Sequence, residues 1–215
     1  MKTVILLSGG IDSTVCLAIA KSLERECFAL SFDYKQQHRI ELEYAKKIAA
    51  HFAVDHHIIT INPHTFASSA LLGTAQADTG RTPEEIANGG IPKTYVPARN
   101  ILFLSYALGY AELLGAEEIY FGANALDRYG YPDCRPAFIE AYQNVINAGT
   151  QMGIDGHPPQ IITPLLNLDK RQIITKAVEL GVTIEMTWSC YAPTENGTPC
   201  NQCDACVLRT TSTPD

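Results

Sequence analysis

The sequence predicts an α/β protein with a doubly wound, mostly parallel five-stranded sheet and a small metal-binding segment near its C-terminal end. Three observations predict this. Short apolar runs alternate with segments of helical periodicity through the first 180 or so residues, which is typical of a parallel sheet built from βαβ units. The stretch SGGIDS, residues 8–13, directly follows the first run, and four of the seven cysteines lie within the last 26 residues.

Composition limits the function classes. The 215 residues are 46% hydrophobic and 18% charged, with a formal net charge of −7, so we expect one soluble main domain that repels polyanions such as nucleic acids. The longest apolar stretch, 101–114, is interrupted by polar residues and is shorter than the ~20 residues of a membrane span. The first residues show no basic leader or apolar signal core, so a cytoplasmic location without membrane contact is expected.

The first half of the chain gives three strand and two helix predictions. Residues 2–7 form an apolar run without polar alternation, which is typical of a central strand covered on both faces. Apolar residues then recur at helical spacing over 13–25 and again over 40–52. Further strands are predicted at 27–32 and 56–61.

The second half begins with a long loop. Residues 62–98 are rich in Gly, Pro, Thr and Ser with little periodicity, which predicts a mobile loop with one helical turn. A helix over 101–114 is predicted to begin at the N-cap Asn100 and to end at Gly115. The remaining predicted elements are a strand at 118–122, a helix at 135–149, a strand at 160–165, and a helix at 169–180 between the N-cap Asp169 and Gly181.

Regular periodicity ends at about residue 187, where Cys, Pro, Asn and Gly become frequent. We therefore divide the chain into an α/β domain, 1–186, and a metal-binding segment, 187–215.

The SGGIDS stretch occupies the first strand-to-helix turn, which is the usual phosphate site of a doubly wound sheet. Two glycines let the backbone approach an anion, the helix N-terminus adds positive potential, and the hydroxyls offer donors. The sequence lacks the lysine of a Walker loop and the spacing of a dinucleotide-binding fingerprint. An ordinary glycine turn with a Ser or Asp cap is the alternative. The candidate nucleotide-binding residues are Ser8, Gly9, Gly10, Ile11, Asp12, Ser13 and Thr14.

SGGIDS resembles the pyrophosphatase-loop signature of enzymes that split ATP between its α and β phosphates. The resemblance implies that the loop grips the departing pyrophosphate while a substrate oxygen takes AMP. Asp12, next to the phosphates, is then a candidate ligand of Mg²⁺, directly or through water.

The cysteines at 190, 200, 203 and 206 have the spacing C-x9-C-x2-C-x2-C. Four thiolates in a loop-rich segment suit a structural tetrahedral Zn²⁺ without an open position. An iron–sulfur cluster is the alternative, although ferredoxins usually have their fourth cysteine downstream. Four unrelated buried cysteines fit poorly in so polar a segment. The expected zinc ligands are therefore Cys190, Cys200, Cys203 and Cys206, whereas Cys16, Cys27 and Cys134 are expected to be packed thiols.

Four further stretches extend the resemblance over nearly the whole chain: FDYKQQH at 32–38, TYVPARN at 94–100, GANALDRYGYPDCR at 122–135, and TWSCYAPTENGTPCNQCDACVLR at 187–209. They are similar to the 7-cyano-7-deazaguanine synthase family of queuosine and deazapurine biosynthesis. The resemblance implies an adenine nucleotide alpha hydrolase-like fold and conversion of 7-carboxy-7-deazaguanine to a nitrile, with ATP, Mg²⁺ and ammonia, through adenylated intermediates. It does not indicate where the ammonia comes from or whether the chain forms a homodimer.

The same stretches suggest substrate and catalytic residues. The donor edge of a guanine-like ring suits a carboxylate, for which Asp133 is the candidate, with Tyr131 or Tyr129 available to stack; a simple turn at 131–133 is the alternative. Asp127 is a candidate to bind Mg²⁺ or to position ammonia. Lys93 and Arg99 are candidates to face the triphosphate or the substrate carboxylate, unless they are solvated charges.

Some residues depart from the family pattern. The family commonly has Asp-Tyr-Gly-Gln-Arg-His, where this chain has Lys35 and Gln37 in place of the Gly and Arg. His38 is a further candidate for the nucleotide site or a structural residue. Two other function classes stay open: a tRNA-modifying ligase of the thiolation or lysidine type, which the negative charge disfavours, and a zinc-bearing partner protein without catalysis.

Overall fold

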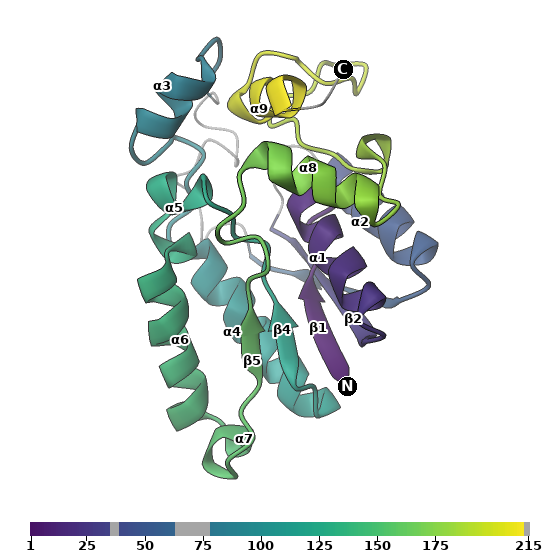
Figure 1. Ribbon diagram of the computed structural model, residues 1–215, viewed down its shortest axis with the longest axis vertical. Coiled ribbons are helices and arrows are strands. Elements are labelled where there is room, and N and C mark those ends of the chain that lie inside the picture. Colours follow the sequence, from purple (N-terminus) through teal and green to yellow (C-terminus); the bar gives the residue numbers. More distant parts are fainter. Residues whose placement is uncertain (35–38, 63–77, 213–215) are drawn as a thin grey trace.

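The computed structural model describes residues 1–34, 39–62 and 78–212. His38, the altered residues 35 and 37 and most of the first half of the predicted long loop lie outside the described residues. Within them, five parallel strands form one sheet in the order β3-β2-β1-β4-β5 (Figure 1). The strands are β1 (Lys2–Leu6), β2 (Glu26–Asp33), β3 (Asp55–Thr60), β4 (Glu118–Tyr120) and β5 (Gln160–Ile162). The predicted doubly wound parallel sheet is confirmed.

The strand order places a topological switch point between β1 and β4. The chain builds the sheet outward from β1 through β2 and β3, then returns to pair β4 with the other side of β1. Crossovers on the two sides of this point lead to opposite faces of the sheet, so a crevice opens at the carboxyl ends of β1 and β4.

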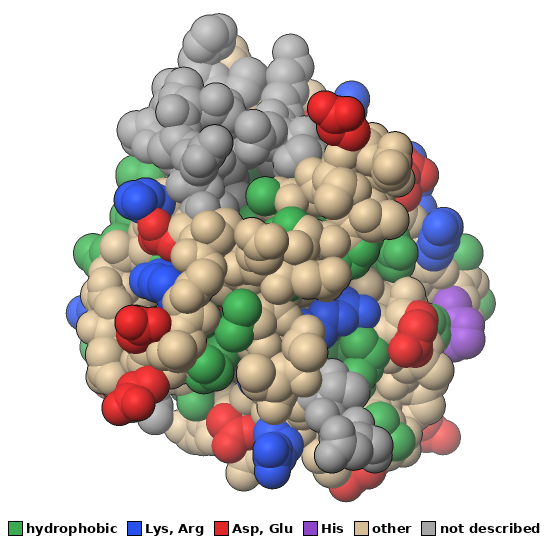
Figure 2. Space-filling view, turned by 90° about the horizontal axis from the view of Figure 1, so that it is seen from above, with side chains coloured by type: hydrophobic (Ala, Val, Ile, Leu, Met, Phe, Trp, Pro, Cys, Tyr) green, Lys and Arg blue, Asp and Glu red, His purple; other side chains and the backbone are tan. Residues whose placement is uncertain are grey.

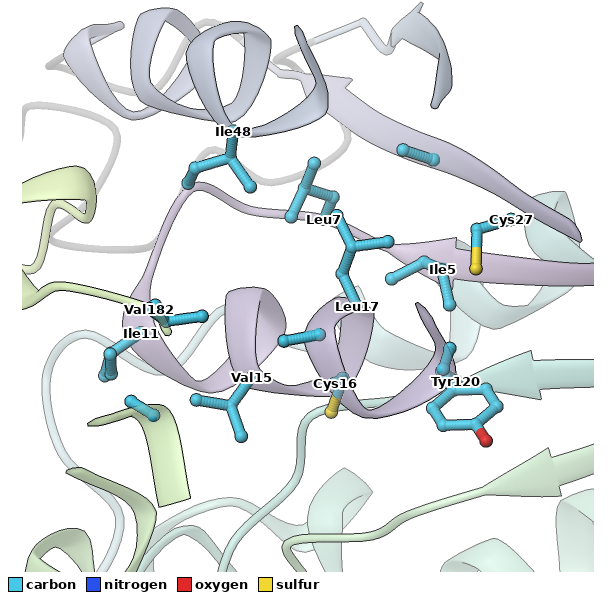
Figure 3. Packing of buried hydrophobic residues seen from close by; sticks show 14 of the residues in the cluster. Ile5, Leu7, Ile11, Val15, Cys16, Leu17, Cys27, Ile48, Tyr120 and Val182 are labelled. Carbon is cyan, nitrogen blue, oxygen red and sulfur yellow. The ribbon is translucent and has the colours of Figure 1, made fainter. Parts of the chain in front are cut away.

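Helices cover both faces of the sheet. The helices α1 (Ile11–Ser22), α2 (Ile40–His51) and α8 (Lys170–Glu179) contribute to one apolar cluster, in which Val15, Leu17, Ile48 and Ile173 are fully buried. Figure 3 shows α1 packed against the strands in this cluster. The helices α4 (Arg99–Leu114) and α6 (Pro136–Gly149) contribute to a second cluster on the opposite face.

Shorter elements complete the fold: α3 (Pro83–Asn88), α5 (Asp127–Gly130), α7 (Gln151–Ile154), α9 (Asp204–Ser212) and 3-10 turns at Pro132–Cys134 and Ile184–Met186. The helix α3 is the helical turn expected within the long loop. The helix α9 was not predicted, and it lies with α3 above the carboxyl ends of the strands (Figure 1).

Two of the predicted helix caps, Asp169 and Gly115, are present in the structure, and a third, Asn100, is not. Asp169 is the N-cap of α8 and accepts a hydrogen bond from the backbone N–H of Gln172, whose side chain bonds back to Asp169. Gly115 closes α4 with φ of +64°. The prediction that Asn100 is the N-cap of α4 is wrong, because Ala98 takes that place with φ of +57°.

Asn100 instead lies in the first turn of α4, and its N–H donates to Asp133 Oδ2 at 3.0 Å. A carboxylate from a distant part of the chain thus supplies the acceptor that an N-cap side chain normally provides. No helix within the described ranges is long and apolar enough to span a membrane.

Candidate active site

The SGGIDS stretch forms a tight loop between β1 and α1. Gly9 has φ of +89°, and a Cβ there would lie 2.3 Å from the backbone oxygen of Glu41 in α2, so only glycine fits. Ser13 Oγ donates to the carbonyl of Gly10 at 3.0 Å and accepts from the N–H of Ser8 at 3.1 Å. Internal hydrogen bonds therefore hold the loop in shape at the N-terminus of a 12-residue helix, which favours anion binding.

A cavity of about 310 Å³ opens beside this loop, at the carboxyl ends of the strands. Five of the seven predicted nucleotide-binding residues line it: Ser8, Gly10, Ile11, Asp12 and Ser13. Gly9 and Thr14 lie behind them, where Gly9 packs on α2 and the Thr14 hydroxyl donates to the carbonyl of Gly10 at 2.8 Å. Aromatic and aliphatic side chains of Leu30, Phe32, Phe103 and Phe121 line another part of the cavity, which suits a planar base.

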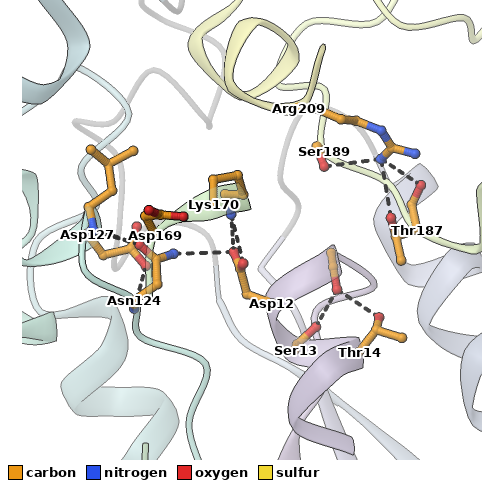
Figure 4. Close-up of polar contacts among 12 residues, drawn as sticks. Asp12, Ser13, Thr14, Asn124, Asp127, Asp169, Lys170, Thr187, Ser189 and Arg209 are labelled. Atoms are coloured by element: carbon orange, nitrogen blue, oxygen red, sulfur yellow. Dashed lines mark hydrogen bonds and ion pairs between the residues drawn. The ribbon is translucent and has the colours of Figure 1, made fainter. Parts of the chain in front are cut away.

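A charged cluster lies on the cavity wall beside the loop (Figure 4). Lys170, the first residue of α8, places its Nζ 2.7 and 2.8 Å from the two carboxylate oxygens of Asp12. Asn124 Nδ2 lies 3.5 Å from Asp12 Oδ2, and the backbone N–H of Asn124 donates to Asp127 Oδ2 at 3.2 Å. The three polar groups Asp12, Lys170 and Asp127 thus come from separate parts of the chain and meet at the switch point.

The Asp127 carboxyl has an unusual environment. Burial and the nearby Asp12 carboxylate raise the pKa of Asp127 to about 7, while Lys170 and the N–H of Asn124 act in the opposite direction. A carboxyl with its pKa near neutrality in a cavity can accept or hold a proton under ordinary conditions.

Arg99, another predicted residue, lines the same cavity at the start of α4. Its guanidinium lies near the Glu41 carboxyl, which also lines the cavity; burial raises the pKa of Glu41 to about 7, and Arg99 offsets part of this effect. Tyr34 shares a hydrogen bond with Arg99. Sequence reasoning did not identify Glu41 or Lys170 as site residues.

The other predicted substrate and catalytic residues separate in space. Tyr131 lines the cavity, and its hydroxyl lies 3.0 Å from Thr94 Oγ1. Asp133 is buried at the N-terminus of α4, outside the cavity lining, and its Oδ1 has no hydrogen-bond partner among the described residues. Lys93 is exposed and pairs with Asp78 at 2.7 Å, also outside the lining. The roles expected of Lys93 and Asp133 toward a substrate stay predictions.

The C-terminal segment is connected to the SGGIDS loop, residues 8–13, which is the predicted phosphate-binding loop and is called the phosphate loop below. The backbone N–H of Trp188 donates to the carbonyl of Gly9 at 2.9 Å, so residues 187–189 run beside the loop. Arg209 in α9 donates to the carbonyl of Thr187 at 3.0 Å and to Ser189 Oγ at 3.3 Å (Figure 4). Arg209 and Ser189 also line the cavity, which places a guanidinium on the side of the cavity formed by the C-terminal segment.

The four predicted metal ligands come together. The ligand atoms of Cys190, Cys200, Cys203 and Cys206 all lie within 4.8 Å of one another, and the sulfurs of Cys200 and Cys206 are 4.0 Å apart. Cys190, Cys203 and Cys206, with Trp188, form a separate small buried cluster, and the partly buried Cys200 packs against it. The arrangement could hold a metal ion.

Figure 2 views the molecule from the face where the strands end. Acidic and basic side chains are interspersed over the part of this face drawn in colour. This face therefore presents no extended basic surface among the described residues.

Comparisons with a family model, with curated proteins and with solved structures give consistent results. A family model described as "Queuosine biosynthesis protein QueC" matches residues 2–213. A 7-cyano-7-deazaguanine synthase of Coxiella burnetii is 51% identical over 209 residues, 97% of this chain and 91% of that protein. One of Nostoc punctiforme is 50% identical over 211 residues, 97% of this chain and 93% of that protein. Among solved structures, NMN synthetase from Francisella tularensis aligns over 94% of this chain and 69% of its own, with a TM-score of 0.52 and 20% identity, which supports the fold alone.

Proposed function

The chain belongs to the family described as queuosine biosynthesis protein QueC, and we propose that it is a 7-cyano-7-deazaguanine synthase, an ATP-dependent carbon–nitrogen ligase. Its substrates are 7-carboxy-7-deazaguanine, ammonia and ATP. The observation that carries this proposal is the sequence identity of 51% and 50%, over 97% of the chain, to two proteins of that name. A cytoplasmic location, where ATP is available, is part of the proposal.

The chemistry requires activation, because a carboxylate does not react with an amine. A carboxylate oxygen attacks the α-phosphorus of ATP, pyrophosphate leaves, and an acyl adenylate forms. Ammonia displaces AMP to give the amide. A second adenylation, on the amide oxygen, followed by loss of AMP gives the nitrile. These steps need no covalent enzyme nucleophile.

The phosphate loop would hold the departing pyrophosphate. Ser8, Gly10 and Ser13 of this loop line the cavity at the N-terminus of α1, and Lys170 and Arg209 place cations on two sides of it. Positive groups fixed where negative charge develops lower the barrier without reorganisation. We propose that Lys170 moves from Asp12 to a phosphate oxygen when ATP binds.

Magnesium fits the oxygen donors of this cluster. Asp12 belongs to the phosphate loop, and Asp127 lines the same cavity. Mg²⁺ prefers oxygen ligands, usually one or two carboxylates together with substrate phosphates. Asp12 would hold the ion, which when bound supplies neutralisation of phosphate charge. Asp127 is available either for the same ion or for ammonia.

The deazaguanine acid would lie against Tyr131, with Arg99 available to its carboxylate. Both side chains line the cavity next to Asp127, so the reacting carboxylate would lie between the phosphate loop and the Asp127 carboxyl. This arrangement suits transfer of AMP to the carboxylate, because proximity and orientation supply much of the catalysis of such reactions.

The metal of the C-terminal segment would be Zn²⁺. With Zn–S bonds of about 2.3 Å, the sulfurs of a tetrahedral site lie about 3.8 Å apart. The separation of 4.0 Å between the sulfurs of Cys200 and Cys206 is close to that value. An iron–sulfur cluster places several atoms between its thiolates and would hold them farther apart. The ion would be structural, because four thiolates leave no open position.

The test is to incubate the purified protein with 7-carboxy-7-deazaguanine, ATP, Mg²⁺ and ammonium. We expect the nitrile, AMP and pyrophosphate. Formation of ADP with the nitrile would rule out adenylation, and salt-sensitive binding of tRNA without any turnover of the deazaguanine acid would support a tRNA-modifying ligase instead.

A further inference from the structure

A second, smaller cavity adjoins the main one. Its volume is about 140 Å³, and Cys134 lines it without lining the main cavity. The other lining residues, among them Asn100, Asp127, Tyr131 and Tyr191, line both cavities. The small cavity is therefore a side chamber that shares a wall with the main cavity.

The size of the side chamber limits its occupant. Pockets for drug-sized ligands are typically about 300–1,000 Å³, whereas a single water takes about 30 Å³ in the liquid. The side chamber, at about 140 Å³, is smaller than the usual range for such ligands and accommodates molecules the size of water or ammonia.

The lining of the side chamber suits a small hydrogen-bond donor. Asp127 supplies carboxylate oxygens, and the Tyr131 and Tyr191 side chains supply phenol oxygens. Arg99 also lines the chamber, and its positive charge disfavours a second cation. Neutral ammonia, which donates hydrogen bonds to oxygen and keeps a lone pair free, matches this lining better than ammonium does.

The chamber is also connected to the charged cluster of the main cavity. Asp127 belongs to both, and the backbone N–H of Asn124, which donates to Asp127, holds this carboxylate beside Asp12 and Lys170. A molecule bound to Asp127 on the chamber side is therefore next to the place where the adenylated carboxyl would lie.

We propose that the side chamber is the ammonia site of the reaction, with Asp127 orienting the lone pair of ammonia toward the adenylated carboxyl carbon. This rests on the proposed function. The nitrogen lone pair forms the C–N bond, and the C–O bond to AMP breaks with its electron pair on the phosphate oxygen. One proton of the nitrogen passes to that phosphate, so AMP leaves as its monoanion and the amide remains.

The experiment narrows the side chamber from a wall that the main cavity does not share. Cys134→Met extends the side chain, and Cys134→Val is a milder change in case the first variant does not fold. Cys27→Met is the matched control, because Cys27 is also buried but lies in β2, away from both cavities. Thermal melting checks that each variant is folded.

Two rates are measured for each variant. The first is pyrophosphate exchange into ATP, dependent on the deazaguanine acid and without ammonium, which reports adenylation alone. The second is nitrile formation at varied ammonium. We expect exchange to be unchanged in Cys134→Met, while the KM for ammonium rises by about tenfold, as when a small binding space is lost. Cys27→Met should change neither.

The other outcomes overturn the proposal. An unchanged KM for ammonium in folded Cys134→Met and Cys134→Val would mean that the side chamber holds only water. A raised KM for the deazaguanine acid, with weakened exchange, would mean that the chamber holds part of that substrate. Absence of exchange in the wild-type protein would instead contradict the proposed function itself, so the two failures are distinguishable.

Discussion

The pair of Lys170 and Asp12 joins the first residue of α8 to the phosphate loop. Because Lys170 contacts both oxygens of the Asp12 carboxylate and lines the cavity, we expect it to transfer its contact to the phosphates of ATP. Lys170→Met should lower the rate of pyrophosphate exchange into ATP, measured with 7-carboxy-7-deazaguanine present, on the order of 10²-fold. This is the effect typical of losing one fixed group that stabilises charge.

The control for this prediction lies on the same helix. Lys176 pairs with Glu179 at 3.1 Å on the exposed side of α8, so Lys176→Met should leave the exchange rate unchanged. If both variants exchange pyrophosphate at the wild-type rate, Lys170 has no part in adenylation.

Glu41 provides a pH-dependent prediction. Burial raises its pKa to about 7 from an ordinary value of 4.5. The folded protein binds this proton more tightly than the unfolded chain does. The free energy of unfolding therefore falls as pH rises between these two pKa values, and the loss is complete once the pH is above the folded pKa. From about pH 6 to pH 8, the wild type should lose about 1 kcal/mol of unfolding free energy relative to Glu41→Gln.

Urea unfolding of both proteins without ligands measures this difference. A gap between wild type and Glu41→Gln that stays constant over the same pH range would show that the Glu41 carboxyl is not buried as described. The wild-type protein alone is not informative here, because Asp127 titrates in the same range.

At the scale of elements, the turn between β1 and α1 accepts only glycine at position 9. Gly9→Ala should lower the unfolding free energy by more than about 2 kcal/mol, because the residue has positive φ and the new methyl group would collide with the backbone of α2. Binding of ATP should weaken as well, since the loop would have to move. Chemical unfolding and calorimetric titration with Mg·ATP measure the two effects.

Gly109 is the matched control for this substitution. It lies within α4, and a Cβ there would meet nothing within 4 Å, so Gly109→Ala should raise stability by up to about 1 kcal/mol through helix propensity. Equal effects of the two substitutions would contradict the close approach of the loop to α2.

Local signals in the sequence predicted the elements that local physics determines. Apolar periodicity predicted the five strands and the helices α1, α2, α4, α6 and α8. The caps Asp169 and Gly115 were predicted from their residue types, because a cap depends on the backbone within a few residues of it. The start of α4 was misjudged because its acceptor is Asp133, which is 33 residues away from Asn100. A distant carboxylate leaves no local signal.

The helix α9 was missed for a related reason. It has nine residues, DACVLRTTS, with a mixed apolar and polar pattern, too short and weakly amphipathic to be recognised by periodicity. The site shows the same limit: the loop residues and cysteines were found because their spacing is local, whereas Lys170 and Glu41 reach the cavity only through the sheet topology.

At the scale of the whole molecule, the C-terminal segment connects several parts of the site. Besides the bond from Trp188 to Gly9, Asp204 of α9 forms an ion pair with Arg81, which precedes α3. The N–H of Gly80 also donates to the carbonyl of Gln202 at 3.0 Å. The segment that carries the cysteine cluster therefore contacts both the phosphate loop and the residues leading to α3. The division of the chain at residues 186 and 187 stays a prediction.

The last prediction follows from this connection. Cys203→Ser should remove the metal and lower the unfolding free energy by more than about 2 kcal/mol, because a structural metal contributes its binding energy to folding. ATP binding should weaken in the same variant, since the segment holding Gly9 loses its support. Cys27→Ser removes a buried thiol in β2 that is not one of the four clustered cysteines and should keep the full metal content. Metal analysis, urea unfolding and nucleotide titration test this together; a metal-free Cys203→Ser protein with wild-type stability and ATP affinity would mean that the cluster acts independently of the phosphate loop.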